Sequence, residues 1–395
     1  MTTKLKKLTI LLSLSFFLIV PLFITSTASA WWFNDRVNVM TQNMYLGADI
    51  FAVLEAAENP DPALGGLDVP IAVAELFQTV QYTNFPERAE AIANQIWFHK
   101  PHLIGLQEVS QWYIQSPGDA AYGGTTPADV LVYDYLQILL DALAARGLNY
   151  KVAVEGYNAD VELPMLTGFT PEGIPTFDDL RLVDRDVILV RGDVHAKKPV
   201  TTNYLTNASE TVGNDTLTFT RGWVAVDVKV CGDKYRFVST HLEVRSTEGS
   251  GFRFIQSAQM QELLTELSSE SKPIILVGDF NSSPTDVPGI YVDPVYGPLP
   301  YVPPYMQAVE AGYLDAWDLI LWPRDGFTSG FSETIDDPHD QLTSRIDMVF
   351  LDPKDKWIKW VIGTVVGDNI FNMTPSGLWP SDHGGVVARV TYSGH

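Results

Sequence analysis

The stretch Ile274-Ile275-Leu276-Val277-Gly278-Asp279-Phe280-Asn281 decides how this chain is expected to fold. Its apolar run, rich in β-branched residues, predicts a buried strand. Two polar side chains, Asp279 and Asn281, end the run. They lie on the same side of an extended chain, because strand side chains alternate with a period of two. The stretch therefore predicts a buried strand that presents an acid and an amide at its carboxyl end.

Polar side chains interrupt or end other apolar segments of the chain in the same way. They are Asn43, Gln107 and Glu108, His241, Asp347, and the pair Asp382 and His383. Each alone has a plain explanation as a cap, a turn residue or a hydrogen-bonded surface group. Together they are acid, amide and imidazole groups at the ends of strands, where a rigid sheet can direct them to one point.

The predicted elements alternate between strand and helix. Strands are expected over residues 37–44, 102–109, 150–155, 186–191, 217–230, 235–241, 273–280, 345–351 and 386–392. Helices are expected over 86–100, 128–146 and 252–267, and long loops over 45–85, 110–127, 156–180 and 282–312. Strands separated by helices, together with hairpins, indicate an α/β fold of two sheets with helices packed outside.

The chemistry that suits these side chains is phosphoester hydrolysis assisted by a hard cation. Mg²⁺ prefers oxygen ligands and keeps several waters, so one or two carboxylates suffice. Glu108 is the best candidate ligand, with Asn43 or Asp382 assisting, and Mn²⁺ is an alternative ion. No clustered His or Cys spacing indicates a zinc site.

The remaining polar groups fit the other needs of that reaction. Asp279 can orient or deprotonate the attacking water, and Asn281 can donate to a phosphate oxygen. His241 and His383 are candidate donors to developing negative charge. A carboxylate that fixes an imidazole tautomer is a familiar pairing, and Asp347 is expected to do this for His383.

Six short motifs, in order along the chain, resemble those of the endonuclease/exonuclease/phosphatase superfamily. They are Thr41-Gln42-Asn43-Met44, Gln107-Glu108-Val109, Ser239-Thr240-His241-Leu242, Gly278-Asp279-Phe280-Asn281, Arg345-Ile346-Asp347 and Ser381-Asp382-His383. The resemblance implies a four-layer sandwich, in which two mostly antiparallel β-sheets pack face to face with helices outside, as in deoxyribonuclease I. It covers nearly the whole chain after the first 30 residues.

The resemblance also implies a role for each matching residue. Glu108 would bind Mg²⁺, assisted by Asn43, with Asp382 near the metal. Asp279 and Asn281 would position water and phosphate, and His241 would contact phosphate. His383 would act in acid–base or transition-state contact, supported by Asp347. Arg185 stands near where some members place a phosphate-contacting residue, and its alternative is a structural ion pair with Asp184 or Asp186.

The first 30 residues have the order of a secretory signal peptide. Lys4, Lys6 and Lys7 precede an apolar run, and Ala28 and Ala30 form a small-x-small cleavage site. We expect cleavage after Ala30, a secreted or periplasmic protein, and a single catalytic domain with loop insertions over residues 31–395. An uncleaved membrane anchor is the alternative. The lone cysteine, Cys231, excludes an internal disulfide framework.

The formal net charge of −22 disfavours nonspecific binding to polyanions. It does not exclude a phosphate substrate, because a bound divalent ion supplies local positive charge. Three substrate classes stay open: nucleic acid, phospholipid and small phosphate esters. Ser282-Ser283-Pro284 follow the GDFN motif where sugar- or inositol-phosphate phosphatases usually have basic residues, which counts against that class.

Two further expectations concern the oligomeric state and the alternative to an enzyme. We expect a monomer with no stable protein partner. The alternative to an enzyme is a noncatalytic binding module on the same fold. Such a module would be expected to have lost one of Glu108, Asp279, Asn281 or His383, and all four are present.

Overall fold

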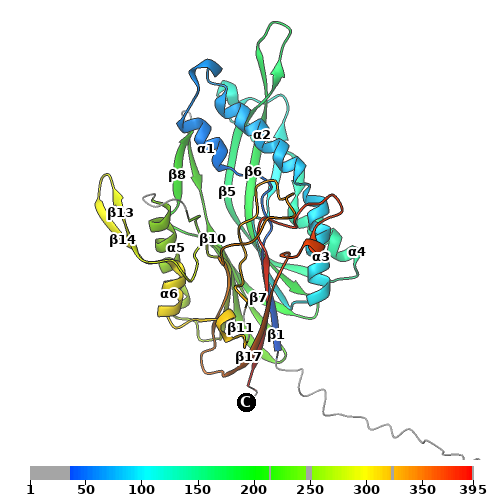
Figure 1. The fold of residues 1–395 in the computed structure, drawn as a ribbon, viewed down its shortest axis with the longest axis vertical. Coiled ribbons are helices and arrows are strands. Elements are labelled where there is room, and N and C mark those ends of the chain that lie inside the picture. The colour runs from blue at the N-terminus through cyan, green and yellow to red at the C-terminus, as the bar shows by residue number, and fades with distance from the viewer. Residues whose placement is uncertain (1–35, 213–214, 246–250, 322–323, 394–395) are drawn as a thin grey trace, which may run out of the picture. The chain divides into compact units, whose positions relative to one another are not determined.

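The computed structural model describes residues 36–212, 215–245, 251–321 and 324–393. The predicted signal peptide lies outside the described residues. Within the described part of the chain, every helix is too short or too polar to cross a membrane. Residues 35–395 form one compact unit, which carries all the elements discussed below (Figure 1).

The larger sheet has eight strands and brings the beginning, middle and end of the sequence together. Its order is β17 (Ile358–Val366), β18 (Gly385–Tyr392), β1 (Arg36–Asn43), β2 (Leu103–Gln107), β6 (Pro175–Arg191), β3 (Gln111–Gln115) and β4 (Val130–Asp134), and β5 (Tyr150–Phe169) also pairs with β6. All of these pairs are antiparallel except β1 with β2.

The smaller sheet has six strands and contains the stretch that the sequence singled out. Its order is β15 (Leu314–Asp315), β16 (Asp347–Asp352), β12 (Ile274–Asp279), β11 (Asp233–His241), β10 (Gly222–Val230) and β7 (His195–Asn203). Only β11 and β12 pair in parallel. Every residue of β12 is buried because both faces of the strand are covered, which explains its continuous apolar run.

Three apolar clusters separate the layers of the fold. The cluster between the sheets combines residues such as Val39 and Val390 with Phe237 and Ile275. On the outer face of the larger sheet, α2 (Asp68–Tyr82), α3 (Phe85–His99) and α4 (Tyr135–Ala145) pack over a second cluster. On the outer face of the smaller sheet, α5 (Phe252–Leu267) and α6 (Pro304–Glu310) cover a third. The predicted four-layer sandwich of two mostly antiparallel sheets is confirmed.

Several predicted loops contain regular structure instead. Residues 45–85 form α1 (Phe51–Glu58) and α2, and residues 156–180 extend β5 and β6 into a long hairpin. The segment 282–312 contains the hairpin of β13 (Gly289–Asp293) and β14 (Gly297–Tyr301) and then α6. The predicted helix over 128–146 is wrong in its first turns, because Val130–Asp134 pairs with β3 as strand β4. Asp134 then caps α4 by accepting from Leu136 N and Gln137 N.

Candidate active site

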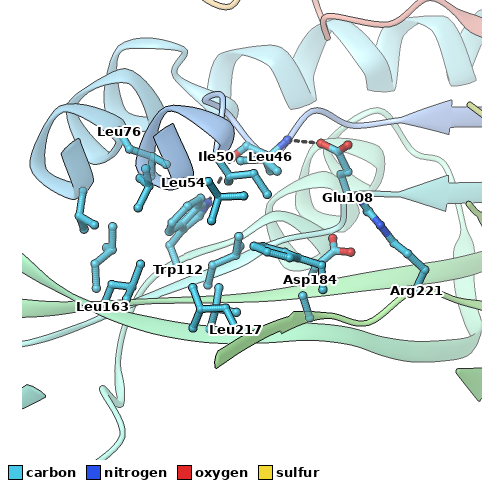
Figure 2. Close-up of a pocket in the computed structure, with 17 residues that line it drawn as sticks. Leu46, Ile50, Leu54, Leu76, Glu108, Trp112, Leu163, Asp184, Leu217 and Arg221 are labelled. Carbon is cyan, nitrogen blue, oxygen red and sulfur yellow. Dashed lines mark hydrogen bonds between the residues drawn. The ribbon is translucent and has the colours of Figure 1, made fainter. Parts of the chain in front are cut away.

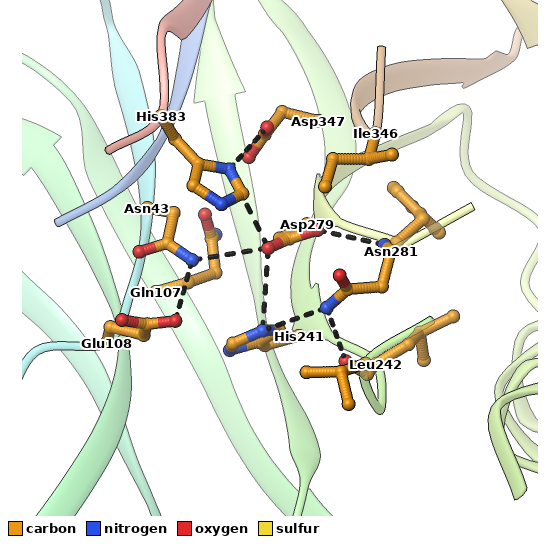
Figure 3. A network of polar contacts seen from close by, with 12 residues as sticks. Asn43, Gln107, Glu108, His241, Leu242, Asp279, Asn281, Ile346, Asp347 and His383 are labelled. Atoms are coloured by element: carbon orange, nitrogen blue, oxygen red, sulfur yellow. Dashed lines mark hydrogen bonds and ion pairs between the residues drawn. The ribbon is translucent and has the colours of Figure 1, made fainter. Parts of the chain in front are cut away.

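All predicted site residues except Arg185 come together where strands of the two sheets end (Figure 3). In the larger sheet, β1 and β2 run in parallel and pair Asn43 with Gln107, so both strands end beside each other and Glu108 follows. In the smaller sheet, β11 and β12 are also parallel and pair His241 with Asp279. Antiparallel β16 begins there, with Asp347 opposite Asp279. Parallel pairing thus brings two carboxyl strand ends from each sheet to the same place.

Glu108 and Asn43 are held in a bonded arrangement at this edge. The Asn43 amide donates to Glu108 Oε1 at 2.9 Å and to Asp279 Oδ2 at 3.2 Å, while Leu46 N donates to Glu108 Oε2 at 2.7 Å. Glu108 has a left-handed backbone with φ of 55°, directly after the end of β2. The same cleft is lined by Glu108, Asp382 and His383.

Glu108 and Asp382 are carboxylates in a site that disfavours negative charge. Burial, together with the nearby Asp382 carboxylate, raises the pKa of Glu108. Burial likewise raises the pKa of Asp382, against the lowering effect of His383 and Arg88. Two neighbouring carboxylates whose pKa values are both raised suit a divalent cation, which would offset their charge.

Arg88 is a structural residue of the site that the sequence analysis missed. Its side chain is fully buried and donates to the carbonyl oxygens of Met44 at 2.7 Å, Tyr45 at 3.1 Å and Pro380 at 3.2 Å. These bonds join the segment after Asn43 to the segment before Asp382. From sequence alone, an arginine within a helix is expected to be exposed to solvent, so only the fold reveals this role.

Asp279 and Asn281 form the centre of the cleft. Asn281 N donates to Asp279 Oδ1 at 2.9 Å, which fixes the carboxylate after the strand ends. Burial and the neighbouring Asp347 raise the pKa of Asp279 to about 7. A carboxylate that exchanges its proton near neutral pH is suited to general base catalysis.

His383 and Asp347 form a close imidazole–carboxylate pair. His383 Nδ1 lies 2.8 Å from Asp347 Oδ2, and Asp347 is fully buried. Thr328 Oγ1 accepts from the backbone N–H of Asp347 at 3.1 Å and so holds the start of β16. Burial disfavours the imidazolium, but Asp347, Asp382 and Asp279 outweigh it and raise the pKa of His383 well above its ordinary value. This favours the imidazolium form of His383, in which Nε2 carries the second N–H.

His241 is neutral and is oriented by Arg221. Arg221 Nη1 lies 3.1 Å from His241 Nδ1, and Arg221 Nη2 lies 3.5 Å from Glu243 Oε1. Because arginine has only donors, His241 Nδ1 accepts and the proton of the neutral ring lies on Nε2, 3.5 Å from Asp279 Oδ2. The Asn281 amide nitrogen, 3.3 Å from Nε2, does not donate to the ring in this tautomer. Burial and the Arg221 charge lower the pKa of His241 well below its ordinary value.

Arg185 lies apart from this set. Its side chain is 3% exposed and pairs with Asp134 at 2.6 Å and Glu155 at 3.1 Å, and Arg185 Nε donates to Val109 O. This is a structural ion pair, though with other partners than the predicted Asp184 or Asp186. Among the described residues, the arginine that lines the cleft is Arg221. The substrate-binding role of Arg185 stays a prediction, and the geometry favours the structural alternative.

Two groups of residues in the cleft have the donor types for a cation. One is the predicted set of Asn43, Glu108 and Asp382. In the other, ligand atoms of Asp279, Asp347 and His383 lie within 4.8 Å of one another. In the second group, the 2.8 Å contact between His383 Nδ1 and Asp347 Oδ2 already pairs two of the three ligand atoms with each other. The first group therefore fits a cation better, and the second fits proton transfer.

Two facing sheets with carboxylates, amides and imidazoles converging at one edge define a phosphoester hydrolase of the deoxyribonuclease I-like fold. The description "Endonuclease/Exonuclease/phosphatase family" belongs to the family model that matches residues 40–383. The chain belongs to this family of metal-dependent phosphoester hydrolases, which confirms the predicted fold, family and class of enzyme. No curated protein matches the sequence.

Solved structures resemble the chain at low identity. An endonuclease/exonuclease/phosphatase family protein from Leptotrichia buccalis is 17% identical, and the match covers 91% of this chain and 100% of that chain with a TM-score of 0.51. A mannosyl-6-phosphatase from Bacteroides thetaiotaomicron is also 17% identical over 91% and 100% of the two chains, with a TM-score of 0.48. TDP2 from Caenorhabditis elegans is 15% identical over 90% and 74%, with a TM-score of 0.46.

Proposed function

We propose that this protein is an exported, Mg²⁺-dependent phosphodiesterase. The observation that carries the proposal is the hydrogen-bonded convergence of Asn43, Glu108 and Asp279 with the His383–Asp347 pair in one cleft. All of these residues were expected from sequence to act together. Family membership supports metal-dependent hydrolysis, and the oxygen-rich donor set of Asn43, Glu108 and Asp382 supports Mg²⁺ over softer ions.

Each residue of the site would have its own role in hydrolysis. Asn43, Glu108 and Asp382 would hold the cation, which when bound neutralises charge on the phosphoryl oxygens. Asp279 would orient a water and accept its proton as the water oxygen bonds to phosphorus. Asn281 and His241 would donate to phosphoryl oxygens. As the phosphorus–oxygen ester bond breaks, His383 would give its Nε2 proton to the leaving oxygen, while Asp347 stabilises the imidazolium.

The proposal of export rests on the sequence of residues 1–30 alone. A positive start, an apolar run and a small-x-small site occur there in the order of a signal peptide. We propose cleavage after Ala30 and a secreted or periplasmic mature protein. Amino-terminal sequencing of the protein recovered outside the inner membrane checks this, and a start at Trp31 is the expected result. A chain that keeps residues 1–30 would contradict it.

Hydrolysis of bis(p-nitrophenyl) phosphate tests the catalytic proposal. It should require Mg²⁺ or Mn²⁺ and stop with chelator. The variants Glu108→Ala and His383→Ala should each lower the rate by at least about two orders of magnitude. Near-wild-type turnover in either variant would defeat the assignment. A noncatalytic module on this fold would bind phosphoesters with no turnover under any of these conditions.

A further inference from the structure

An apolar pocket lies beside the proposed cleft (Figure 2). Six elements each contribute a wall residue: Leu54 from α1, Leu76 from α2, Trp112 from β3, Leu163 from β5, Leu182 from β6, and Phe219 from β9 (Asp215–Phe219). Leu163 and Phe219 are only half-buried, so the pocket meets the surface there. We call this feature the apolar pocket.

The apolar pocket and the catalytic cleft share part of their lining. Glu108, Arg221, Leu46 and Ile50 line both. Glu108 belongs to the proposed cation site, and Arg221 orients His241. A ligand whose phosphate is bound near Glu108 can therefore extend directly into the apolar pocket.

The chemistry of the pocket wall selects among the possible extensions. Among the described residues that line it, the charged side chains are Glu108, Asp184 and Arg221, and they stand at the end near the cleft. Deeper in, the Trp112 indole N–H is already used, because it donates to Leu46 O at 3.2 Å. A nucleobase or sugar placed there would leave its own polar groups unpaired, which is costly. A saturated hydrocarbon chain loses nothing by the same burial and gains from it.

Part of the pocket wall comes from segments outside the two large sheets, while Trp112, Leu163 and Leu182 come from strands of the larger sheet. α1 and α2 lie between β1 and α3 in the sequence, and the hairpin of β8 (Ala208–Val212) and β9 lies between β7 and β10. α1 packs against β8, and β5 packs against β9, so these segments close around the pocket. The catalytic residues all lie outside them. The pocket is therefore a feature added beside the reaction centre, in a position to select the substrate.

We infer that the substrate is a phosphodiester bearing an aliphatic chain, and that this chain binds in the apolar pocket. The inference rests on the proposed function, because it assigns the group attached to the phosphate in the cleft. The net charge of −22 agrees with it, since an acidic protein gains little affinity from a polyanionic substrate. Affinity would come instead from apolar burial next to one neutralised phosphate.

A series of p-nitrophenyl alkyl phosphodiesters, from ethyl to decyl and below their micelle concentrations, tests the inference. For the wild type, kcat/KM should rise with each added methylene by up to about fourfold, and level off when the pocket is full. Leu163→Trp, which fills the pocket, and Leu217→Glu, which places a charge on its β9 wall, should each lower the decyl-to-ethyl ratio at least about tenfold. Leu299→Trp is the matched control on β14, a half-buried leucine outside the pocket, and should keep the wild-type ratio.

The outcomes separate this inference from the proposed function. Hydrolysis with no dependence on chain length would overturn the inference and leave the phosphodiesterase standing. A dinucleotide p-nitrophenyl ester preferred over the decyl ester, with that preference lost in Leu163→Trp, would also overturn it. If no ester is hydrolysed, the proposed function fails. Calorimetric binding of ethyl and decyl phosphonate then tests the pocket assignment by itself. Tighter decyl binding that Leu163→Trp removes would support the pocket assignment, and equal binding would overturn it.

Discussion

Replacing Asp347 by Asn isolates the contribution of the imidazole–carboxylate pair. Asp347 Oδ2 lies 2.8 Å from His383 Nδ1, and both residues are buried, so the substitution removes one negative charge at contact distance and little volume. An opposite charge this close raises the pKa of a histidine by about 1–3 units, each unit corresponding to about 1.4 kcal/mol. Without it, burial opposes the imidazolium and only Asp382 and Asp279 remain to favour it, so the pKa of His383 falls. We therefore expect kcat/KM at pH 7 to fall by about 10²–10⁴-fold.

The pH–rate profile of the same variant gives the more specific readout. Because His383 must be protonated to donate, the alkaline limb of the wild-type profile should lie well above pH 7 and should move down by about 1–3 units in Asp347→Asn. Asp355→Asn is the matched control, an exposed carboxylate beyond the other end of β16, and should leave the limb in place. An Asp347→Asn enzyme with an unmoved limb and a rate within threefold of wild type would refute the reasoning.

Three further predictions concern residues outside the proposed catalytic set. Arg185→Gln should lower the free energy of unfolding by about 1–3 kcal/mol in urea melts, because Asp134 and Glu155 lose a buried partner but stay partly hydrated. The KM of this variant should change little. A large rise in KM at unchanged stability would favour substrate binding by Arg185. Arg88→Met should cost at least about 3 kcal/mol in the same assay, since it leaves several buried carbonyl oxygens without a donor, and a cost below about 1 kcal/mol would contradict this. Burial and Arg191 lower the pKa of His102 to about 4 in the folded protein, below its unfolded value of about 6.5. The neutral form of His102 therefore contributes its full stabilisation above pH 6.5, and this contribution is lost as the pH falls toward 4. The Tm of His102→Gln should therefore fall less than that of wild type between pH 7 and 4.5, whereas parallel curves would contradict it.

The convergence of the proposed catalytic residues could be predicted from sequence because each stands at a strand end that local patterning already marks. Asp279 and Asn281 follow an apolar run, and the structure pairs β12 with β11 so that His241 lies opposite Asp279. Arg88 and Arg221 could not be found in this way. Arg88 lies within a helix and Arg221 just before a strand, and their roles depend on long-range contacts with carbonyl oxygens and with His241.

The two-sheet core could be predicted for the same reason, and the segments around it could not. β12 and α5 carry clear apolar patterns, and the bounds of α5 agree with those expected. The outer parts of β5 and β6 are half-exposed and mixed in polarity, so residues 156–180 resemble a loop until their mutual pairing is known. The exposed, β-branched segment Val130–Val132 pairs only at a sheet edge, and its apolar residues resembled the start of α4.

Binding of Mn²⁺, followed by electron paramagnetic resonance, tests most directly where the cation is held. Wild-type protein, Glu108→Gln and Asp347→Asn would be titrated under the same conditions. If Asn43, Glu108 and Asp382 hold the ion, Glu108→Gln should lose at least about tenfold in Mn²⁺ affinity and Asp347→Asn should stay close to wild type. Unchanged binding in Glu108→Gln, with binding lost in Asp347→Asn, would contradict this account and assign the ion to Asp279, Asp347 and His383.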